Sequence, residues 1–365
     1  MHATDALKEA DRLMTVCNSC RYCEGLCAVF PAMEMRRAFS SGDLNYLANL
    51  CHACGACYTD CQFSPPHEFN VNVPRTLATV RAQSYAHYAW PGALAVLFRR
   101  NGLFVALATA ASVALFIFAF IGAGGAHFGE AVQGTGAFYR IMPHELIAWL
   151  FGGVFTFGLV ALVLSLRRFW RDIGEPAESP LAPRPLLQAI KDAGSLRYLD
   201  GGGVGCYNKD EKPDDNRRFY HHLTFYGFML CFAATSVGAL YHFLLGREAP
   251  YPWWDLPVVL GTLGGLGLVV GPIGLLRARR RRDPALIDGG SAGMDKAFTV
   301  MLLLTAVSGL LLLVLRATPA MNALLAIHLG IVFALFLSLP YGRFVHGLYR
   351  FAALVRYAQE RAHDA

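Results

Sequence analysis

Charged residues are scarce in this chain of 365 residues: Asp, Glu, Lys and Arg make up 16% of the sequence, and hydrophobic residues make up 55%. Soluble domains carry about 25% charged residues, so the composition argues against an ordinary soluble protein. Six stretches contain no charged side chain and are long enough to cross a bilayer, which takes about 20 residues. These stretches are residues 102–126, 146–166, 219–246, 256–276, 297–315 and 317–342.

Other absences bear on function. Paths for ions or substrates through a membrane usually contain ionisable residues, and the lack of Asp, Glu, Lys and Arg in all six stretches argues against a transporter. A Gly-x-Gly-x-x-Gly turn for a nucleotide or flavin is also missing, because GGGVG at 201–205 and GAGGAH at 122–127 lack the third glycine. We therefore expect no flavin in this chain.

The net charge of +6 follows the connections between the apolar stretches. Residues 167–218 contain ten Lys or Arg, residues 277–296 contain six, and the tail from residue 343 contains four, whereas 127–145, 247–255 and 316–320 contain one each. Basic residues mark the cytoplasmic side, and MHATDALKEADRL lacks the apolar core of a secretory signal. We expect a multi-pass protein of a bacterial inner membrane, with both termini in the cytoplasm and no nucleic-acid partner.

Eight of the ten cysteines lie in two N-terminal motifs, CNSCRYCEGLC at 17–27 and CHACGACYTDC at 51–61. Both have the spacing Cys-x2-Cys-x2-Cys-x3-Cys. Disulfides are disfavoured in a reducing cytoplasm, so clustered cysteines there indicate metal or redox chemistry. Zinc usually takes two well-separated cysteine pairs, whereas in two-cluster ferredoxins with this spacing the fourth cysteine ligates the other cluster.

The spacing therefore predicts two [4Fe–4S] clusters with crossed ligands. We expect one cluster on Cys17, Cys20, Cys23 and Cys61, and the other on Cys51, Cys54, Cys57 and Cys27. The proline that usually follows the fourth cysteine lies four positions later, at Pro31 and Pro65, so the loops depart from the ferredoxin pattern. We expect Cys206 and Cys231 to be structural.

Two of the apolar stretches have histidines near both ends. His221 and His242 are 21 residues apart, and His328 and His346 are 18 apart, which is five turns if one helix joins them. Because the two stretches run in opposite directions, matching of depth pairs His221 with His346 and His242 with His328. Ionisable residues in membranes are usually functional, so these pairs predict bis-histidine ligation of one or two b-type haems.

Several neighbouring residues are assigned with less specific signals. His222 is an alternative ligand to His221. Arg217, Arg218 and Arg343 flank the cytoplasmic pair, and we expect them to neutralise haem propionates. His127 and His144 are expected to be interfacial or hydrogen-bonding residues.

The predicted fold class is mainly α. A small ferredoxin-like cytoplasmic domain with two [4Fe–4S] clusters, residues 1–98, is expected to precede a six-helix cytochrome b-type bundle in residues 99–365. Within the fourth stretch, Gly261-x3-Gly265 and Gly267-x3-Gly271 indicate close helix packing.

Longer segments carry a family resemblance from about residue 13 to 357. The two cysteine motifs, followed by LDGGGVGCYN, RRFYHHLTFYGF, REAPYPWWDLPVVLGTLGG and LPYGRFVHGLYRFAAL, resemble the tricarballylate-utilisation protein B family, also called citrate-utilisation protein B. The resemblance implies a membrane electron carrier that reoxidises a separate, FAD-dependent cytoplasmic dehydrogenase, which converts tricarballylate to cis-aconitate. Electrons would pass through the clusters and haem b to the quinone pool.

Two other functions remain open. The histidine spacing in the last stretch also resembles cytochrome b subunits of the nitrate reductase and heterodisulfide reductase type, which would allow electrons to run from quinol to a cytoplasmic reductase. A non-enzymatic membrane redox sensor or transporter accessory is the third hypothesis. In every case the substrate site is expected on a partner, so no catalytic residue is assigned in this chain.

Overall fold

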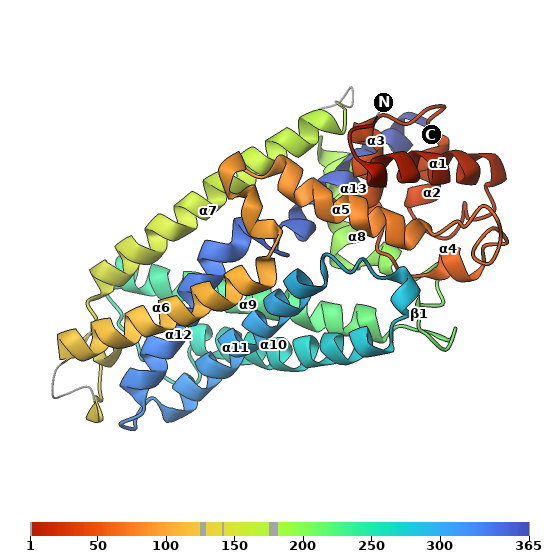
Figure 1. Cartoon of the computed structure of the whole chain (residues 1–365). Helices are drawn as coiled ribbons and strands as arrows, with labels where there is room; N and C mark the ends of the chain where they lie inside the picture. The colour runs from red at the N-terminus through yellow and green to blue at the C-terminus, as the bar shows by residue number, and fades with distance from the viewer. Residues whose placement is uncertain (1, 125–128, 141, 175–181, 365) are drawn as a thin grey trace.

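The computed structural model describes residues 2–124, 129–140, 142–174 and 182–364. It is almost entirely helical, as the sequence predicts (Figure 1). The N-terminal part, residues 2–98, consists of short helices and is called the cysteine-rich domain below. Its elements are α1 (Asp5–Cys20), α2 (Val29–Glu34), α3 (Ser41–Leu50), α4 (Ala56–Thr59), α5 (Val73–Tyr88) and the 3-10 helix η1 (Gly92–Phe98).

Side-chain caps set where the helices beside the cysteine motifs begin. The hydroxyl of Thr4 accepts a hydrogen bond from the Leu7 N–H at the start of α1. Ser40 and Asp43 form a reciprocal capping box at the start of α3. Such caps satisfy backbone donors that have no partner inside the helix and contribute about 0.5–2 kcal/mol each. α1 and α3 therefore begin at fixed positions, and each cysteine motif starts at or near the opposite, C-terminal end of one of these helices.

In the described part of the chain six helices are long and apolar enough to cross a membrane, which confirms the six predicted stretches. We call them the apolar bundle, and in Figure 1 they extend away from the cysteine-rich domain. α9 is the least buried of the six and α12 the most. The helices are α6 (Asn101–Gly124), α7 (His144–Asp172), α9 (Asn216–Leu245), α10 (Leu256–Arg281), α11 (Ala292–Leu315) and α12 (Met321–Ser338).

Glycines bring α9 and α10 close together. A Cβ built on Gly267 would lie 2.9 Å from a carbonyl oxygen of α9, and one on Gly271 would lie 2.7 Å from the backbone nitrogen of Thr224. Such spacing lets two helix backbones meet directly, so the close packing expected for this pair of glycines is confirmed. The other predicted pair divides between two neighbours, because Gly261 approaches α9 and Gly265 approaches α11.

The longer connections lie mostly at the cysteine-rich end. Between α7 and α9 are α8 (Pro183–Gly194), η4 (Arg197–Leu199) and a two-stranded antiparallel sheet, β1 (Cys206–Tyr207) and β2 (Pro213–Asp214). Gly205 has φ +103°, and a Cβ there would lie 2.4 Å from the Asp214 oxygen, so this turn requires glycine. The remaining connections contain η3 (Ala137–Tyr139) and η5 (Pro284–Leu286).

The last apolar helix does not continue to His346, and the expectation of one helix from His328 to His346 is wrong. The 3-10 helix η6 (Leu339–Tyr341) follows α12, Gly342 is extended, and a new helix, α13 (Val345–Asp364), begins beyond it. Pro340 lies at this break and lacks the N–H that an α-helix needs there. His346 therefore belongs to a separate helix.

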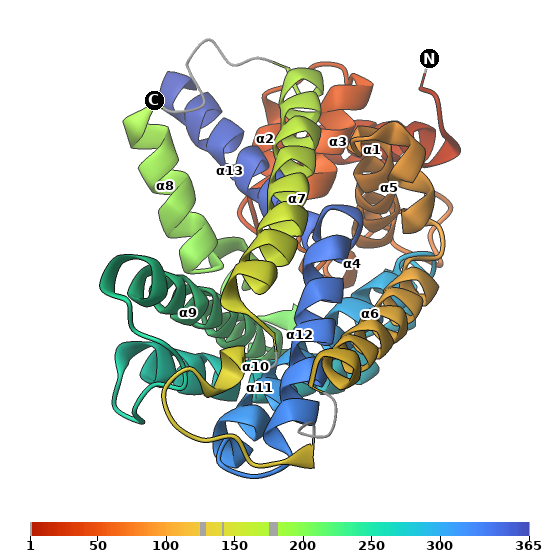
Figure 2. The ribbon, with the colours of Figure 1, turned by 90° about the vertical axis from the view of Figure 1, so that its left-hand side faces the viewer.

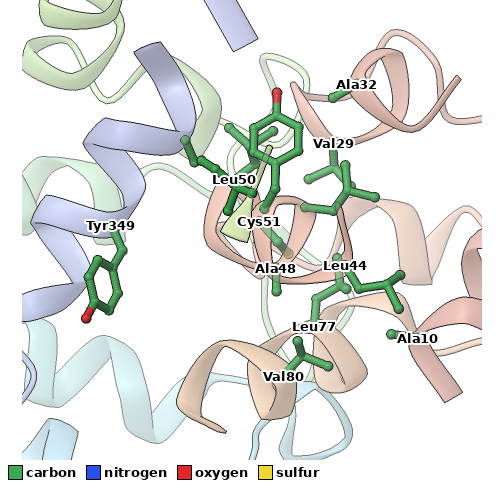
Figure 3. Packing of buried hydrophobic residues seen from close by; sticks show 14 of the residues in the cluster. Ala10, Val29, Ala32, Leu44, Ala48, Leu50, Cys51, Leu77, Val80 and Tyr349 are labelled. Carbon is green, nitrogen blue, oxygen red and sulfur yellow. The ribbon is translucent and has the colours of Figure 1, made fainter. Parts of the chain in front are cut away.

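That helix packs into the cysteine-rich domain. Tyr349 and neighbouring residues of α13 share one buried cluster with α1, α2, α3 and α5 (Figure 3). Arg36, just after α2, pairs with Glu360 of α13 at 2.5 Å and with Asp43 at 2.6 Å, with only 9% of its side chain exposed. α8 lies against the other side of α13 (Figure 2). The C-terminal segment is thus part of the core that carries both cysteine motifs.

Candidate metal centres and the paired histidines

The first cysteine motif starts in the last turn of α1. Arg21 adopts a left-handed conformation with φ 55°, and its N–H donates to the Cys17 oxygen, which ends the helix and turns the chain towards Cys23. Cys61 reaches the same place from the turn after α4. The sulfur-bearing side chains of one predicted set, Cys17, Cys20, Cys23 and Cys61, all line a single cavity of 210 Å³.

The second predicted set lines a second, smaller cavity. Cys51 ends α3, and Cys57 lies in α4. Between them Gly55 has φ +96°, and a Cβ there would lie 2.8 Å from the Leu286 side chain, so the loop can make this turn only with glycine. The members of this set are Cys27, Cys51, Cys54 and Cys57. The cavities adjoin, because Cys57 and Phe30 line both.

The electrostatics of the thiols follow the same grouping. Burial raises the pKa of Cys17 to about 12, and Cys23, Cys61 and Cys20 add to the shift. Burial likewise raises the pKa of Cys27, with Cys54 and Cys51 adding to it. Thiols with such values are neutral in the metal-free chain, so a metal centre that takes thiolates would release protons as it binds.

The donor sets fit iron–sulfur clusters better than single ions. Each predicted set of four cysteines, the ligand number of a [4Fe–4S] cluster, lies complete on the lining of one cavity, and Cys57 of the second set reaches the first cavity as well. Among the residues that the structure describes, no three His, Cys, Asp or Glu side chains are placed to hold one metal ion. The sulfurs surround a volume instead of meeting at a point. Ligation itself stays a prediction.

The two remaining cysteines have different surroundings. Cys231 faces α10, where its sulfur would lie 2.8 Å from a Cβ on Gly264, as suits a packing residue. Cys206 lies in β1 beside the second cavity: the N–H of Tyr207 donates to the Cys54 oxygen at 2.8 Å. Cys206 also helps to raise the pKa of Cys54 to about 11, after burial. Cys206, for which a structural role is expected, thus lies at the edge of a candidate centre.

His221 of α9 and His346 of α13 face each other, as predicted. Their ring centres are 6.1 Å apart, with the rings inclined at 72°. These two side chains would hold a haem b, which would supply one-electron redox chemistry when bound.

A hydrogen bond orients one of these two rings, that of His346. His346 Nδ1 lies 2.5 Å from the Arg343 carbonyl oxygen, which can only accept, so Nδ1 carries the proton and Nε2 keeps its lone pair. Burial, assisted by Arg343 and Arg350, lowers the pKa of His346 well below its usual value, so the ring is neutral. His221 Nδ1 is buried and has no hydrogen-bond partner among the described residues. His222 instead stacks on Tyr226 of its own helix.

The second predicted pair is placed differently. No ring contact joins His242 to His328 in the described part of the chain. His242 stacks on His144 with ring centres 3.4 Å apart, and the Nδ1 atoms of both are buried without a hydrogen-bond partner among the described residues. The pairing of His242 with His328 stays a prediction, and His144 is a neighbour that sequence reasoning did not pair with it. His127 lies outside the described residues.

His328 has a hydrogen-bond partner on α11. Its Nδ1 lies 2.9 Å from the Ser308 hydroxyl oxygen, and that hydroxyl donates to the Thr305 oxygen at 3.1 Å. A Cβ on Gly309 would lie 3.0 Å from the His328 ring, so only glycine leaves room for the ring in this position.

The three arginines assigned to haem propionates all have protein partners. Arg217 donates to the backbone oxygens of His52 and Ala53. Arg218 lies 3.9 Å from Asp200 and from Asp215, and Arg343 lies 3.0 Å from Asp295. A propionate role stays a prediction for all three. The partners of Arg217 could not be found from sequence, because they depend on how α9 docks against a loop far away in the chain.

Comparison with known proteins identifies the family of this chain. Two family models match: Citrate utilization protein B over residues 97–365, and the Citrate utilization protein B Fer4-like domain over residues 10–87. The chain belongs to the citrate utilization protein B family. It is 50% identical over 361 residues to Citrate utilization protein B of Escherichia coli, an alignment that covers 98% of this chain and 93% of that protein. No solved structure matches the chain.

Membership confirms the family resemblance found in the sequence. A Fer4-like domain that contains both cysteine motifs indicates an iron–sulfur electron-transfer role. The six long apolar helices are compatible with a multi-pass membrane protein.

Proposed function

We propose that this protein is a membrane electron-transfer subunit. It would reoxidise a separate FAD-dependent dehydrogenase of the tricarballylate dehydrogenase type in the cytoplasm. Two [4Fe–4S] clusters and haem b supply the one-electron redox chemistry when bound, and membrane quinone is the acceptor. The substrate site lies on the partner.

One observation carries this proposal. The eight motif cysteines line two adjoining cavities. The helices that present His221 and His346 to each other, α9 and α13, also donate hydrogen bonds from Arg217 and Arg350 to the loop that lines the second cavity. A row of candidate redox sites thus leads from the cysteine-rich domain to the apolar bundle. This order suits transfer between a protein on one side and a quinone in the membrane.

The first cavity is accessible to a partner protein. Tyr22, between Cys20 and Cys23, is 73% exposed, whereas Cys51 of the second set is buried. A docked dehydrogenase would therefore meet the first cavity before the second. In membrane terms, the positive-inside pattern of the connections supports a cytoplasmic location of the cysteine-rich domain and both termini.

The proposal is tested by composition and by turnover. Protein purified without oxygen is expected to contain about eight iron atoms per chain, as two [4Fe–4S] clusters require, together with haem b. In vesicles that contain quinone, the reduced partner dehydrogenase should reduce the quinone only when this protein is present. Absence of both iron and haem would refute the proposal. Reduction of the haem by quinol but not by the dehydrogenase would reverse its direction, towards a cytoplasmic reductase.

A further inference from the structure

Four arginines from four separate elements hold the loop between Cys51 and Cys54 by hydrogen bonds; we say below that they grip the loop. Their guanidinium groups donate to backbone carbonyl oxygens, and none comes from the loop itself. Arg81 of α5 donates to Ala48 and Cys51 (3.1 and 2.5 Å), Arg350 of α13 to Asn49 and Cys51 (3.2 and 2.8 Å), Arg217 of α9 to His52 and Ala53 (3.0 and 3.1 Å), and Arg282, just after α10, to Ala53 (2.8 Å). The loop is thus attached to both the cysteine-rich domain and the apolar bundle.

These arginines hold positive charge in a largely enclosed place: Arg81 is buried, and the other three are partly buried. Burial and the charge of neighbouring arginines lower the pKa of Arg350 and of Arg282 to about 9. Ion pairs at this end of the molecule are made by other arginines, such as Arg218, Arg279 and Arg343, and the four that grip the loop make none among the described residues. Buried charge without a counter-charge is costly. Four thiolates around an iron–sulfur cluster would supply the missing negative charge.

Two of the arginines are in register with the paired histidines. Arg217 precedes His221 by four residues on α9, and Arg350 follows His346 by four residues on α13. Residues four apart lie on one face of a helix, about one turn of 5.4 Å from each other. Each helix therefore grips the loop with an arginine and presents a histidine one turn away.

The first cavity has the opposite electrostatic setting. Asp60 lies on its lining and helps to raise the pKa of Cys23, after burial and the neighbouring thiols. A nearby carboxylate disfavours the added negative charge of a reduced centre, whereas guanidinium groups favour it. The first cavity thus has a carboxylate on its lining, whereas the loop that lines the second cavity accepts hydrogen bonds from guanidinium groups.

We propose that Arg217 and Arg350 are positioning residues that hold the Cys51–Cys54 loop one helical turn from the His221–His346 pair, and that their charge makes the second centre easier to reduce than the first. Electrons would then pass from the first centre to the second, which has the higher reduction potential, and so towards the apolar bundle. This inference rests on the proposed function and adds an internal direction to it.

The test compares Arg217→Gln and Arg350→Gln with the unaltered protein, by redox titration of the two clusters followed by electron paramagnetic resonance. In both variants the reduced-to-oxidised ratio of the second cluster at a fixed potential is expected to fall about tenfold, equivalent to about 59 mV for one electron. The first cluster should keep its potential. Arg281→Gln is the matched control, because Arg281 adjoins Arg282 in sequence but pairs with Asp214 at 3.2 Å and does not grip the loop.

A second pair of variants separates charge from position. Arg217→Lys and Arg350→Lys keep the charge but lose the forked donor geometry, so the cluster potential should hold while transfer from clusters to haem slows at least about tenfold, a change of about 1.4 kcal/mol in the barrier. These variants also serve if the glutamine variants fail to assemble.

Two results would overturn the inference. One is a second-cluster ratio within about twofold of the unaltered protein in both glutamine variants, and the other is an equal shift in Arg281→Gln. Unaltered protein without clusters or haem would instead refute the proposed function, so the two failures can be told apart.

Discussion

Crossed ligation makes a sharp prediction about pairs of cysteine substitutions. Cys17 and Cys61 line the first cavity, and Cys27 and Cys51 line the second. The double variant Cys17→Ser with Cys61→Ser damages one cavity, so about four iron atoms per chain should remain, as in either single variant. Cys17→Ser with Cys27→Ser damages both cavities, although the two cysteines belong to one motif. Almost no non-haem iron should remain in that protein, and the iron counts of this prediction exclude haem iron.

The assay is iron and acid-labile sulfide per chain in protein purified without oxygen, with electron paramagnetic resonance of the reduced sample. Cys231→Ser is the control and should keep about eight iron atoms, because Cys231 lies between α9 and α10. The reverse pattern would refute the reasoning. If Cys17→Ser with Cys27→Ser keeps half of the iron while Cys17→Ser with Cys61→Ser loses nearly all of it, each motif binds its own cluster.

Three further predictions concern the histidine pair, the helix contact and the C-terminal helix. His221→Gln should remove the haem held with His346, because one axial ligand is lost; the pyridine haemochrome assay measures haem per chain. Gly271→Ala should cost about 1–3 kcal/mol of stability, because the new Cβ overlaps backbone atoms of α9, and a lower Tm in detergent reports it. Glu360→Ala should cost about 1–3 kcal/mol, because it removes a buried partner of Arg36 and of the Tyr46 hydroxyl, and faster proteolysis of α13 reports it.

Each of these changes has a matched control in the chain. His222→Gln should leave the haem content unchanged, and equal loss in both histidine variants would contradict the assignment of His221. Gly152→Ala meets no atom within 4 Å and should leave Tm unchanged, so a similar loss there would show that helix propensity or lipid contact is being measured. Glu9→Ala removes a surface ion pair with Arg12, worth about 0–1 kcal/mol; equal effects at Glu9 and Glu360 would contradict the structural argument.

Sequence patterns predicted the features that depend on residues close together in the chain. Runs without charge predict the six long helices, because a bilayer fixes the length of a spanning helix, and the structure confirms them. The Cys-x2-Cys-x2-Cys-x3-Cys spacing predicts two crossed sets, and the structure gathers each set at its own cavity. In both cases the signal lies within one motif or one helix.

Features that depend on docking were out of reach of the sequence. The grip of Arg217 and Arg350 on the Cys51–Cys54 loop joins segments more than 160 and almost 300 residues away, and arginines at such positions are equally typical of a basic membrane edge. The contact of His242 with His144 likewise depends on how α9 and α7, which are far apart in the chain, meet each other. Pro340 can interrupt a helix, but only the structure shows that α12 ends just before it.

The central claim is that electrons pass from the second cysteine site to the histidine pair and on to quinone. Anaerobic stopped-flow absorbance of the haem tests it most directly, with the reduced partner dehydrogenase as donor and a quinone added second. We predict rapid haem reduction and reoxidation in the unaltered protein. In Cys51→Ser we predict that reduction by the dehydrogenase is lost, while haem reduced by dithionite is still reoxidised by quinone. Haem that the dehydrogenase reduces equally fast in Cys51→Ser would contradict the claim.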